Sequence, residues 1–480
     1  MAAWIVCALC ALVIIKPQEF IGALEGQPLL YVVFGLALVG VALDVTWRRL
    51  RLSLAPQVPW VLAFLAWAAL TTAVRSPETL SERGTALAIT GIIFLTVAVG
   101  AGSARGLWRL GATLVGCAAL ISTVAILQAF EPYVCMAPED PEDWDGKGEL
   151  SPDGRPCETD LQCLQTAPDP QIRYRCERTG PLNTSTLRDR VRYRGSLADP
   201  NETSLMICTA LPLAFALADR GRRRRGPAPR PGARPPSPRS SGGAGAIVRG
   251  LSVAAMVIAA GVVVVLSRSR TGLIVYLVVL GLHLVRRIGA WAIVAGCLIG
   301  PPMILLGGRS GADADASSEE RLELVLEGFE MIKGTRGSGI GVGQFVNESS
   351  LGMTAHNAYL LAAAETGLVG VCLFGVALYA SLKVPLAIWF ADRDTGDVAA
   401  RFAPAIFMSL CGALVGIFFL SWAYKDVLYI ALGTSAALHA AVRAEGGGLR
   451  VRVSPREIAL VCAGMIALLA ALVGVVRLRL

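Results

Sequence analysis

The stretch NAYLLAAAETGLVGVCLFGVALYA, residues 357–380, decides the fold of this chain. A helix needs roughly 20 consecutive apolar residues to cross the hydrocarbon core of a bilayer, and this run is long enough. Glu365 is its only charged residue. The stretch therefore predicts a membrane-spanning helix that carries one carboxylate.

Similar apolar runs recur along the whole chain. Of its 480 residues, 54% are hydrophobic and 17% are charged, which is too apolar for an ordinary soluble domain. The runs lack the alternation of barrel strands, so we predict an all-α polytopic membrane protein with about 12–13 transmembrane helices. The first run has neither a basic region before it nor a small-residue cleavage site, so we interpret it as an anchor. The predicted spans are 2–15, 29–44, 58–72, 85–101, 107–130, 202–218, 251–267, 272–285, 289–306, 357–380, 402–422, 425–441 and 458–476.

The distribution of the net charge of +8 predicts the orientation. Basic residues follow the second, sixth, eighth and twelfth spans, and all lie on one side if the N-terminus is inside, as the positive-inside rule requires. The exception is Arg477 and Arg479, which thirteen spans would leave outside. The inside arginines are Arg48, Arg49, Arg51, Arg222 to Arg225, Arg286, Arg287, Arg443, Arg450, Arg452 and Arg456.

This orientation divides the chain into five segments. We expect N-terminal membrane helices (1–130), a periplasmic loop (131–201), membrane helices with a basic cytoplasmic linker at 219–250 (202–306), a periplasmic catalytic loop (307–356) and C-terminal membrane helices (357–480). The first loop holds four of the chain's 12 cysteines, and two disulfides are expected there, with three possible pairings. A metal site is less favoured, because no histidine accompanies these cysteines and their spacing does not suit zinc. The disulfide candidates are Cys135, Cys157, Cys163 and Cys176.

The second outside loop contains an amphipathic pattern and then a run of glycines. Residues 318–333 have apolar side chains at helical spacing, which predicts a helix at the membrane–water boundary. A dinucleotide-binding interpretation of the glycines is excluded, because no strand precedes them. Two interpretations remain: close approach of the backbone to the membrane or to a bulky ligand, and a plain flexible loop. The glycines are Gly337, Gly339, Gly341 and Gly343.

His356 is one of only three histidines in the chain. Thr354 is expected to cap the following helix, which would place His356 in its first turn, where the helix dipole keeps the ring neutral, as a general base requires. Asn357 would orient a substrate or the ring. The alternative is a boundary histidine that hydrogen-bonds the backbone. Glu365 lies roughly 180° around the helix from His356 and is expected to pair elsewhere.

Arginines occur at the outer mouths of two spans. Arg268 and Arg270 lie between two apolar runs with almost no loop, and Arg192 and Arg194 precede the span that begins near Asn201. Several guanidinium groups together suit a diphosphate, because each can bind phosphate in bidentate fashion. The alternative is interfacial snorkelling. The other two histidines, His283 and His439, are interpreted as packed or interfacial residues.

Three stretches resemble the O-antigen ligase and O-antigen polymerase family of bacterial envelope glycosyltransferases, which are of the GT-C type. The first is Arg192-Tyr193-Arg194-Gly195 with Asp199-Pro200-Asn201, and the second is Ser269-Arg270-Thr271. The third joins Gly339-x-Gly341-x-Gly343-x-Phe345, His356-Asn357-x-x-Leu360 and Glu365-x-Gly367. Together they cover roughly residues 190–370, and the third stretch is the most specific.

The resemblance implies a membrane-embedded, metal-independent, inverting glycosyltransferase without a cofactor. Its donor would be an oligosaccharide on undecaprenyl diphosphate at the periplasmic face of the inner membrane. His356 would be the catalytic base and Arg192 and Arg270 the diphosphate ligands, with Arg194 and Arg268 as alternatives two residues away. Asn357, Asn201 and Glu365 would position the substrate. The chain departs from the family pattern in its cysteine-bearing insertion at 131–180 and its basic linker, which leaves the acceptor open.

Several alternatives remain open at this point. Three acceptors remain open, namely a growing glycan, lipid A-core and a protein hydroxyl, so both polymerase and ligase in exopolysaccharide or lipopolysaccharide synthesis stay as alternatives. A polysaccharide transporter or lipid-linked-glycan flippase is the rival from another class, although a transporter should carry its charges near the bilayer midplane. A nucleic-acid partner is not expected, because no aromatic residues separate the linker arginines.

Overall fold

The fold is a bundle of membrane-spanning helices with a small sheet at one end. The computed structural model describes residues 1–24, 26–50, 54–138, 150–169, 174–219, 243–294, 296, 298, 312–391, 398–446 and 450–478. Within these residues, twelve helices are long and apolar enough to cross a membrane. The prediction of an all-α polytopic membrane protein is therefore confirmed.

The helices agree closely with the predicted spans, except that the span predicted at 289–306 lies mostly outside the described residues. The spanning helices are α1 (Ala2–Ile15), α2 (Leu29–Thr46), α3 (Val58–Arg75), α4 (Leu80–Gly100), α5 (Ala104–Gln128), α7 (Pro200–Ala218), α8 (Gly243–Leu266), α9 (Arg270–Ile288), α13 (Ala358–Ala391), α14 (Ala403–Gly416), α15 (Asp426–Ala444) and α16 (Pro455–Arg477). The other elements are α6 (Asp160–Gln165), α11 (Ala312–Gly334), α12 (Gln344–Glu348), β1 (Tyr133–Pro138), β2 (Leu150–Pro156), β3 (Arg175–Gly180) and β4 (Thr184–Ser185).

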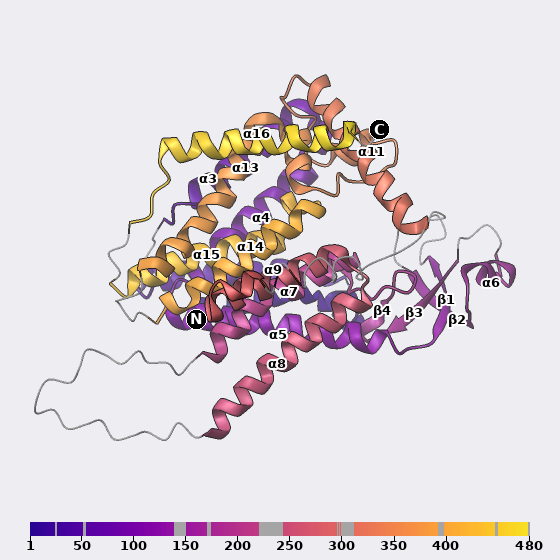
Figure 1. Cartoon of the computed structure of the whole chain (residues 1–480), viewed down its shortest axis with the longest axis horizontal. Coiled ribbons are helices and arrows are strands. Elements are labelled where there is room, and N and C mark those ends of the chain that lie inside the picture. The colour runs from indigo at the N-terminus through magenta and orange to yellow at the C-terminus, as the bar shows by residue number, and fades with distance from the viewer. Residues whose placement is uncertain are drawn as a thin grey trace, which may run out of the picture.

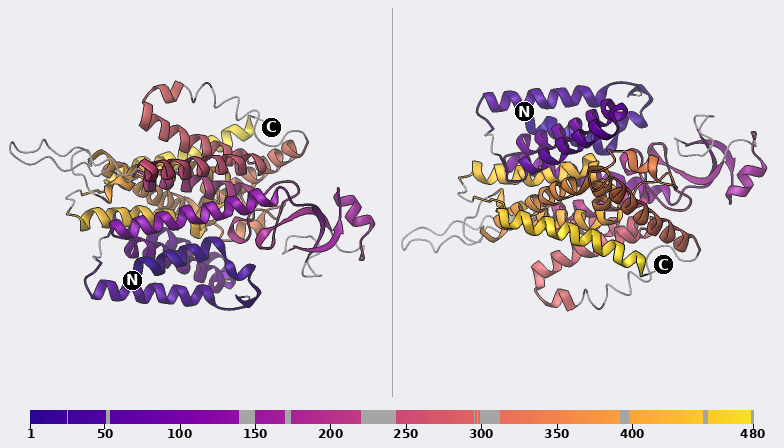
Figure 2. Two further views of the ribbon diagram at one scale, coloured as in Figure 1. Left: turned by 90° about the horizontal axis from the view of Figure 1, so that it is seen from below. Right: turned by 90° about the horizontal axis from the view of Figure 1, so that it is seen from above.

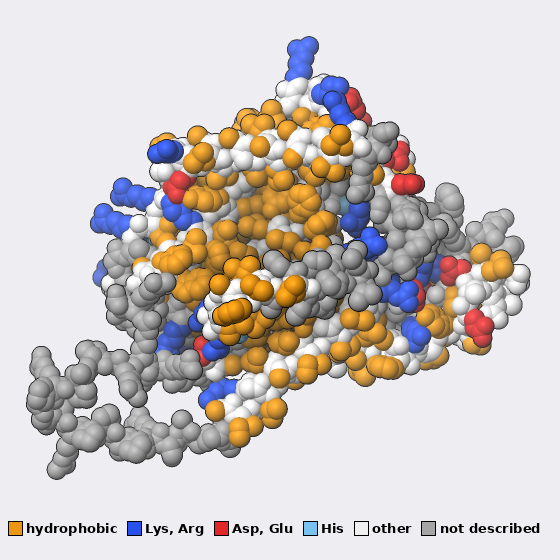
Figure 3. All heavy atoms as spheres, viewed as in Figure 1, with side chains coloured by type: hydrophobic (Ala, Val, Ile, Leu, Met, Phe, Trp, Pro, Cys, Tyr) orange, Lys and Arg blue, Asp and Glu red, His pale blue; other side chains and the backbone are white. Residues whose placement is uncertain are grey.

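The bundle has two distinct ends (Figures 1 and 2). We call the end that carries β1–β4 the sheet end, and the end where α7 finishes and α8 begins the linker end. The N-terminus lies towards the linker end and the C-terminus towards the sheet end. Hydrophobic side chains cover the surface between the two ends, whereas lysine and arginine side chains gather at the margins (Figure 3).

The centre of the bundle is formed by α7, α13, α14 and α15. The α4–α15, α7–α14 and α3–α13 pairs pack extensively, whereas few residues of α2, α8 and α16 are buried. Exposed apolar side chains on a peripheral helix suit contact with lipid rather than water. The amphipathic helix predicted at 318–333 is part of α11, which packs against α13 and α16.

Short polar side chains begin several of the helices. Ser269 caps α9 through Gly272 N–H, and Asp199 caps α7 through Asn201 N–H. Pro200 follows Asp199 at the first helical position, where its missing N–H costs nothing. These caps fix where α7 and α9 start, and both starts lie at the sheet end beside the candidate site.

Candidate active site at the sheet end

His356 lies just outside the helix that it was expected to begin. The side-chain oxygen of Asn357 caps α13, accepting hydrogen bonds from Tyr359 N (3.0 Å) and Leu360 N (2.9 Å). The Thr354 hydroxyl instead pairs with Ser421 Oγ at 2.6 Å. The prediction that Thr354 caps the helix and places His356 in its first turn is therefore wrong. His356 precedes the cap, with φ of 47°.

The environment of His356 favours a neutral imidazole. Burial lowers its pKa most, and the nearby Arg321 lowers it further, while Asp199 and Glu320 act in the opposite direction. Burial disfavours the charged ring because the interior solvates an imidazolium poorly. Asp199 is the cap residue of α7, and Glu320 and Arg321 lie on α11, so both helices place charged groups near the histidine. Asp199 was part of the motif before Asn201 but was not predicted as a site residue, and Arg321 has no local motif of its own.

The glycine loop is held against a kink in α13. Glu365 Oε1 accepts hydrogen bonds from Gly343 N (2.8 Å) and Phe345 N (3.3 Å), and the Glu365 carbonyl accepts one from Gly341 N (2.9 Å). Glu365 is buried, and it pairs away from His356, as its helical position indicated. Gly367, with φ of 73°, interrupts the helix there.

This kink explains why the loop needs glycines. A Cβ on Gly339 would lie 2.5 Å from the Glu365 carbonyl oxygen, and one on Gly367 would lie 2.3 Å from the Gly337 carbonyl oxygen. Real Cβ atoms do not approach backbone so closely. Both sequence interpretations of the loop therefore need correction: the glycines allow close approach to α13 itself, and the loop is bound to that helix through its backbone.

The turn between α14 and α15 joins the histidine segment to α7. Ser421 contacts Thr354, and Trp422 Nε1 donates a hydrogen bond to Glu202 Oε1 at 2.8 Å. Lys425 Nζ lies 3.6 Å from the same carboxylate oxygen. Segments far apart in sequence thus meet beside His356. Sequence analysis did not identify this turn, because its contribution depends on tertiary contacts.

Asn201 connects α7 to the turn between α8 and α9. Its Oδ1 accepts hydrogen bonds from Ser269 Oγ (2.7 Å) and Arg190 Nη2 (3.3 Å). Arg190 is buried, and its Nε also donates to the Ser267 carbonyl at 2.8 Å. Asn201 therefore has a visible packing role. Sequence analysis missed Arg190, although it precedes Arg192 and Arg194 at the same two-residue spacing.

Arg192 and Arg194 are largely buried and bound by the protein. Arg192 Nη2 lies 3.3 Å from Glu177 Oε2, and its Nε donates to the Ser185 carbonyl at 3.0 Å. Arg194 Nε lies 3.5 Å from Glu19 Oε2. Burial lowers the pKa of Arg192 and raises that of Glu177, and the attraction between the two opposes both shifts. These arginines hold the sheet against the bundle.

Arg268 and Arg270 are more accessible. Both are exposed at the turn between α8 and α9, where Arg270 is the first residue of α9. Arg268 Nη1 pairs with Asp189 Oδ2 at 2.7 Å, and both side chains remain about half exposed. The four arginines therefore fall into two pairs: Arg192 and Arg194 within the protein, and Arg268 and Arg270 at its surface.

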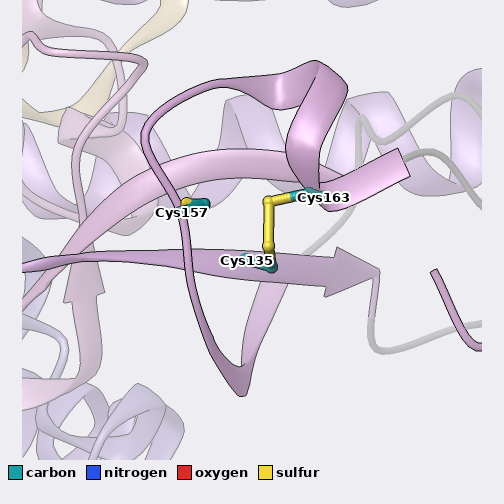
Figure 4. A group of neighbouring side chains, drawn as sticks. All are labelled: Cys135, Cys157 and Cys163. Carbon is teal, nitrogen blue, oxygen red and sulfur yellow. A yellow bond between two sulfur atoms is a disulfide. The ribbon is translucent and has the colours of Figure 1, made fainter. Parts of the chain in front are cut away.

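The four cysteines of the first loop form two disulfides. Cys135 pairs with Cys163, and Cys157 pairs with Cys176. In a sheet of order β2-β1-β3-β4, the first disulfide joins β1 to α6, and the second joins β3 to the residue that follows β2. The sulfurs of Cys135, Cys157 and Cys163 lie close enough together to suggest a metal site (Figure 4), but each belongs to a disulfide and offers no thiolate. The strands were not predicted, because the sequence between 131 and 180 has little periodicity.

Fold and site together define a polytopic membrane protein with a polar, histidine-containing site at one end of the bundle. Residues 254–375 match the family model described as O-antigen ligase, which includes Arg268, Arg270, His356 and Glu365. No curated protein matches this chain. This match covers about a quarter of the chain and agrees with the resemblance seen in the motifs. The matched region is therefore similar to an O-antigen ligase domain, a kind of domain that acts in envelope polysaccharide synthesis.

Proposed function

We propose that this protein transfers a glycan from undecaprenyl diphosphate to an acceptor hydroxyl at the periplasmic face of the bacterial inner membrane. The sheet end would face the periplasm. Two observations support this orientation. The first is that the disulfides lie at the sheet end, because disulfides persist in oxidising compartments. The second is that, in the sequence, Arg222 to Arg225 stand between α7, which ends at the linker end, and α8, which begins there, in agreement with the positive-inside rule.

In the proposed reaction, His356 removes a proton from the acceptor hydroxyl. The hydroxyl oxygen forms a bond to the anomeric carbon of the donor while the bond from that carbon to the diphosphate oxygen breaks. The configuration inverts, the proton remains on the imidazole, and undecaprenyl diphosphate leaves as an anion. The observation that carries this proposal is the lowered pKa of a histidine held at the meeting point of α7, α11 and α13.

Fixed positive charge would stabilise the departing diphosphate. Arg270 and Arg268 are the better placed ligands, because their side chains are exposed, whereas those of Arg192 and Arg194 are largely buried. We therefore assign direct diphosphate contact first to Arg270. Arg192 and Arg194 would contribute charge and hold the sheet. With arginines in this role, the reaction needs no metal ion.

The first experiment measures glycan transfer by His356→Ala and Arg270→Ala variants in membranes supplied with lipid-linked donor. Both should lose product while inserting at the normal level. Arg443→Ala is the matched control, because Arg443 is an exposed arginine in the last turn of α15, at the opposite end of that helix from the turn beside His356. Normal product from both site variants would contradict the proposal.

A second experiment separates the enzyme from a flippase and identifies the acceptor. In a deletion strain, a transferase defect leaves lipid-linked repeat units on the outer face of the membrane, whereas a flippase defect leaves them on the inner face. Surface glycan reduced to single repeat units indicates a polymerase, and intact polymer that is not attached to lipid A-core indicates a ligase. Unchanged lipid A-core glycan with loss of a protein-bound glycan indicates a protein acceptor.

A further inference from the structure

A polar cavity lies at the linker end, far from the site described above. It has a volume of about 360 Å³, is open to the surface and lies between the end of α7, the beginning of α8 and the end of α9. Figure 1 shows the beginning of α8 projecting from the bundle at this end. The cavity is lined by Phe215, Ala218, Asp219, Ala246, Arg249, Gly250, Val253, His283 and Arg287.

The charge of this cavity is positive. Arg249 and Arg287 line it, and within the described residues neither guanidinium forms an ion pair or a hydrogen bond. Its one carboxylate, Asp219, lies 4.0 Å from Arg286, so that arginine already offsets it. His283 adds a ring nitrogen, Nδ1, which is buried and has no partner among the described groups. The cavity therefore offers hydrogen-bond donors to an anion, and among the described residues no anionic group binds the two guanidinium groups.

The walls around these polar groups are apolar and continue to the surface of the bundle. Phe215 packs against the His283 ring at a centroid distance of 4.0 Å, and Val253 lies on the facing side of α8. Further along α8, Leu251 and Ile258 are exposed. A ligand with an anionic head and hydrocarbon chains would satisfy both the arginines and this apolar surface.

We propose that the cavity binds the phosphate headgroup of an anionic phospholipid. Arg249 and Arg287 contact the phosphate oxygens, His283 donates or accepts a hydrogen bond at the headgroup, and the acyl chains lie along the exposed face of α8. Basic pockets between spanning helices are typical sites for anionic headgroups. The inference does not depend on the proposed transfer reaction, because none of these residues belongs to that site.

The experiment is a titration of the purified full-length protein with phosphatidylglycerol, followed by native mass spectrometry. We expect Arg249→Gln and Arg287→Gln each to weaken binding about fivefold, the effect of losing one basic residue near an anionic headgroup. Arg443→Gln is the matched control: Arg443 is an exposed arginine near the end of α15 and does not line the cavity. It should bind phosphatidylglycerol like the wild type.

The wild-type protein alone provides a second test that does not depend on the folding of a variant. Phosphatidylglycerol should bind more tightly than phosphatidylethanolamine, whose headgroup has no net charge, and millimolar inorganic phosphate should not displace it. Equal binding of the two lipids would overturn the proposal. Displacement by inorganic phosphate would also overturn it and would identify a site for a soluble anion. Equal affinity of the wild type and both arginine variants is the third contradicting result.

Discussion

His356 combines a left-handed backbone with a largely buried ring. Its φ of 47° is uncommon for a residue other than glycine, although histidine, asparagine and aspartate adopt it more readily than others. Such conformations persist where the surrounding structure imposes them, and here the Asn357 cap and the contact between Thr354 and Ser421 fix the backbone on both sides. The chain therefore presents the imidazole from a rigid position.

The first prediction concerns replacement of this imidazole. His356→Asn keeps a residue that tolerates positive φ but removes the base, so we expect glycan transfer to fall by about 10²- to 10⁴-fold with little change in thermal stability. Transfer assays and thermal unfolding of the purified protein measure the two effects. A variant that unfolds together with its loss of activity would point to a structural histidine.

The second prediction is the pH dependence of transfer. The pKa of His356 lies below the ordinary value of 6.5, so the neutral base persists at pH 6.5 and is lost only at more acidic pH. The sign follows from burial, which favours the uncharged ring in the folded protein. A pH profile of transfer should therefore show its acidic limb below 6.5, and the residual rate of His356→Asn should lack this limb. An acidic limb above 6.5 in the wild type would contradict the assignment.

The third prediction separates two roles of Asn357. As a helix cap, Asn357 can be replaced by Asp with little loss, whereas Asn357→Ala should destabilise the protein by about 1 kcal/mol. Thermal unfolding measures this difference. If the amide nitrogen also positions a substrate, Asn357→Asp will keep stability and lose activity. Full activity in the Asp variant would show that Asn357 acts as the helix cap and does not position the substrate.

At the scale of elements, the kink of α13 connects the glycine loop to the bundle. Leu368 N donates to the Gly337 carbonyl at 2.9 Å, and Ile340 N donates to the Ala364 carbonyl at 3.1 Å. Together with the hydrogen bonds to Glu365, these contacts attach the glycine loop to α13 where that helix is interrupted. The position of the loop that leads to His356 is therefore fixed by α13.

The fourth prediction tests this coupling. Gly367→Ala introduces a Cβ that would lie 2.3 Å from the Gly337 carbonyl oxygen at a positive φ, so we expect destabilisation by more than about 1 kcal/mol and reduced transfer. Thermal unfolding and transfer assays give the readout. Gly281→Ala is the control, because Gly281 is a helical glycine of α9 with open space around its Cβ position. Equal stability of the two variants would contradict a tight contact.

At the scale of the whole molecule, the disulfide-linked sheet meets the bundle of membrane helices at the sheet end. Gln128, at the end of α5, bonds to the Thr184 hydroxyl through its amide nitrogen and to Arg192 N–H through its oxygen. Arg178 also donates to the Ala129 carbonyl at 2.6 Å. The sheet is thus attached to the bundle by polar contacts beside the arginines.

The fifth prediction concerns the topology of the whole chain. With the linker end inside, a reporter fused after α16 should lie in the periplasm, where alkaline phosphatase is active and green fluorescent protein exported unfolded is dark. A fusion after α15 should give the opposite result, because one span fewer precedes the reporter. Equal reporter activity at the two positions would contradict the passage of α16 across the membrane.

The sequence alone determined the spans and the family resemblance. Span prediction succeeds because the length of an apolar run is a local property, set by the thickness of the bilayer. The motif from Gly339 to Gly367 was visible for the same reason, since its residues lie close together in sequence.

Only the tertiary structure decided what those residues contact. Arg192 and Arg194 are bound by Glu177 and Glu19, the Glu365 carboxylate holds the glycine loop, and the cap of α13 is Asn357. Charged and polar side chains can pair with any suitable neighbour, and their partners here come from distant segments. Which arginines remain exposed, and which groups surround His356, therefore depends on the packing of the helices.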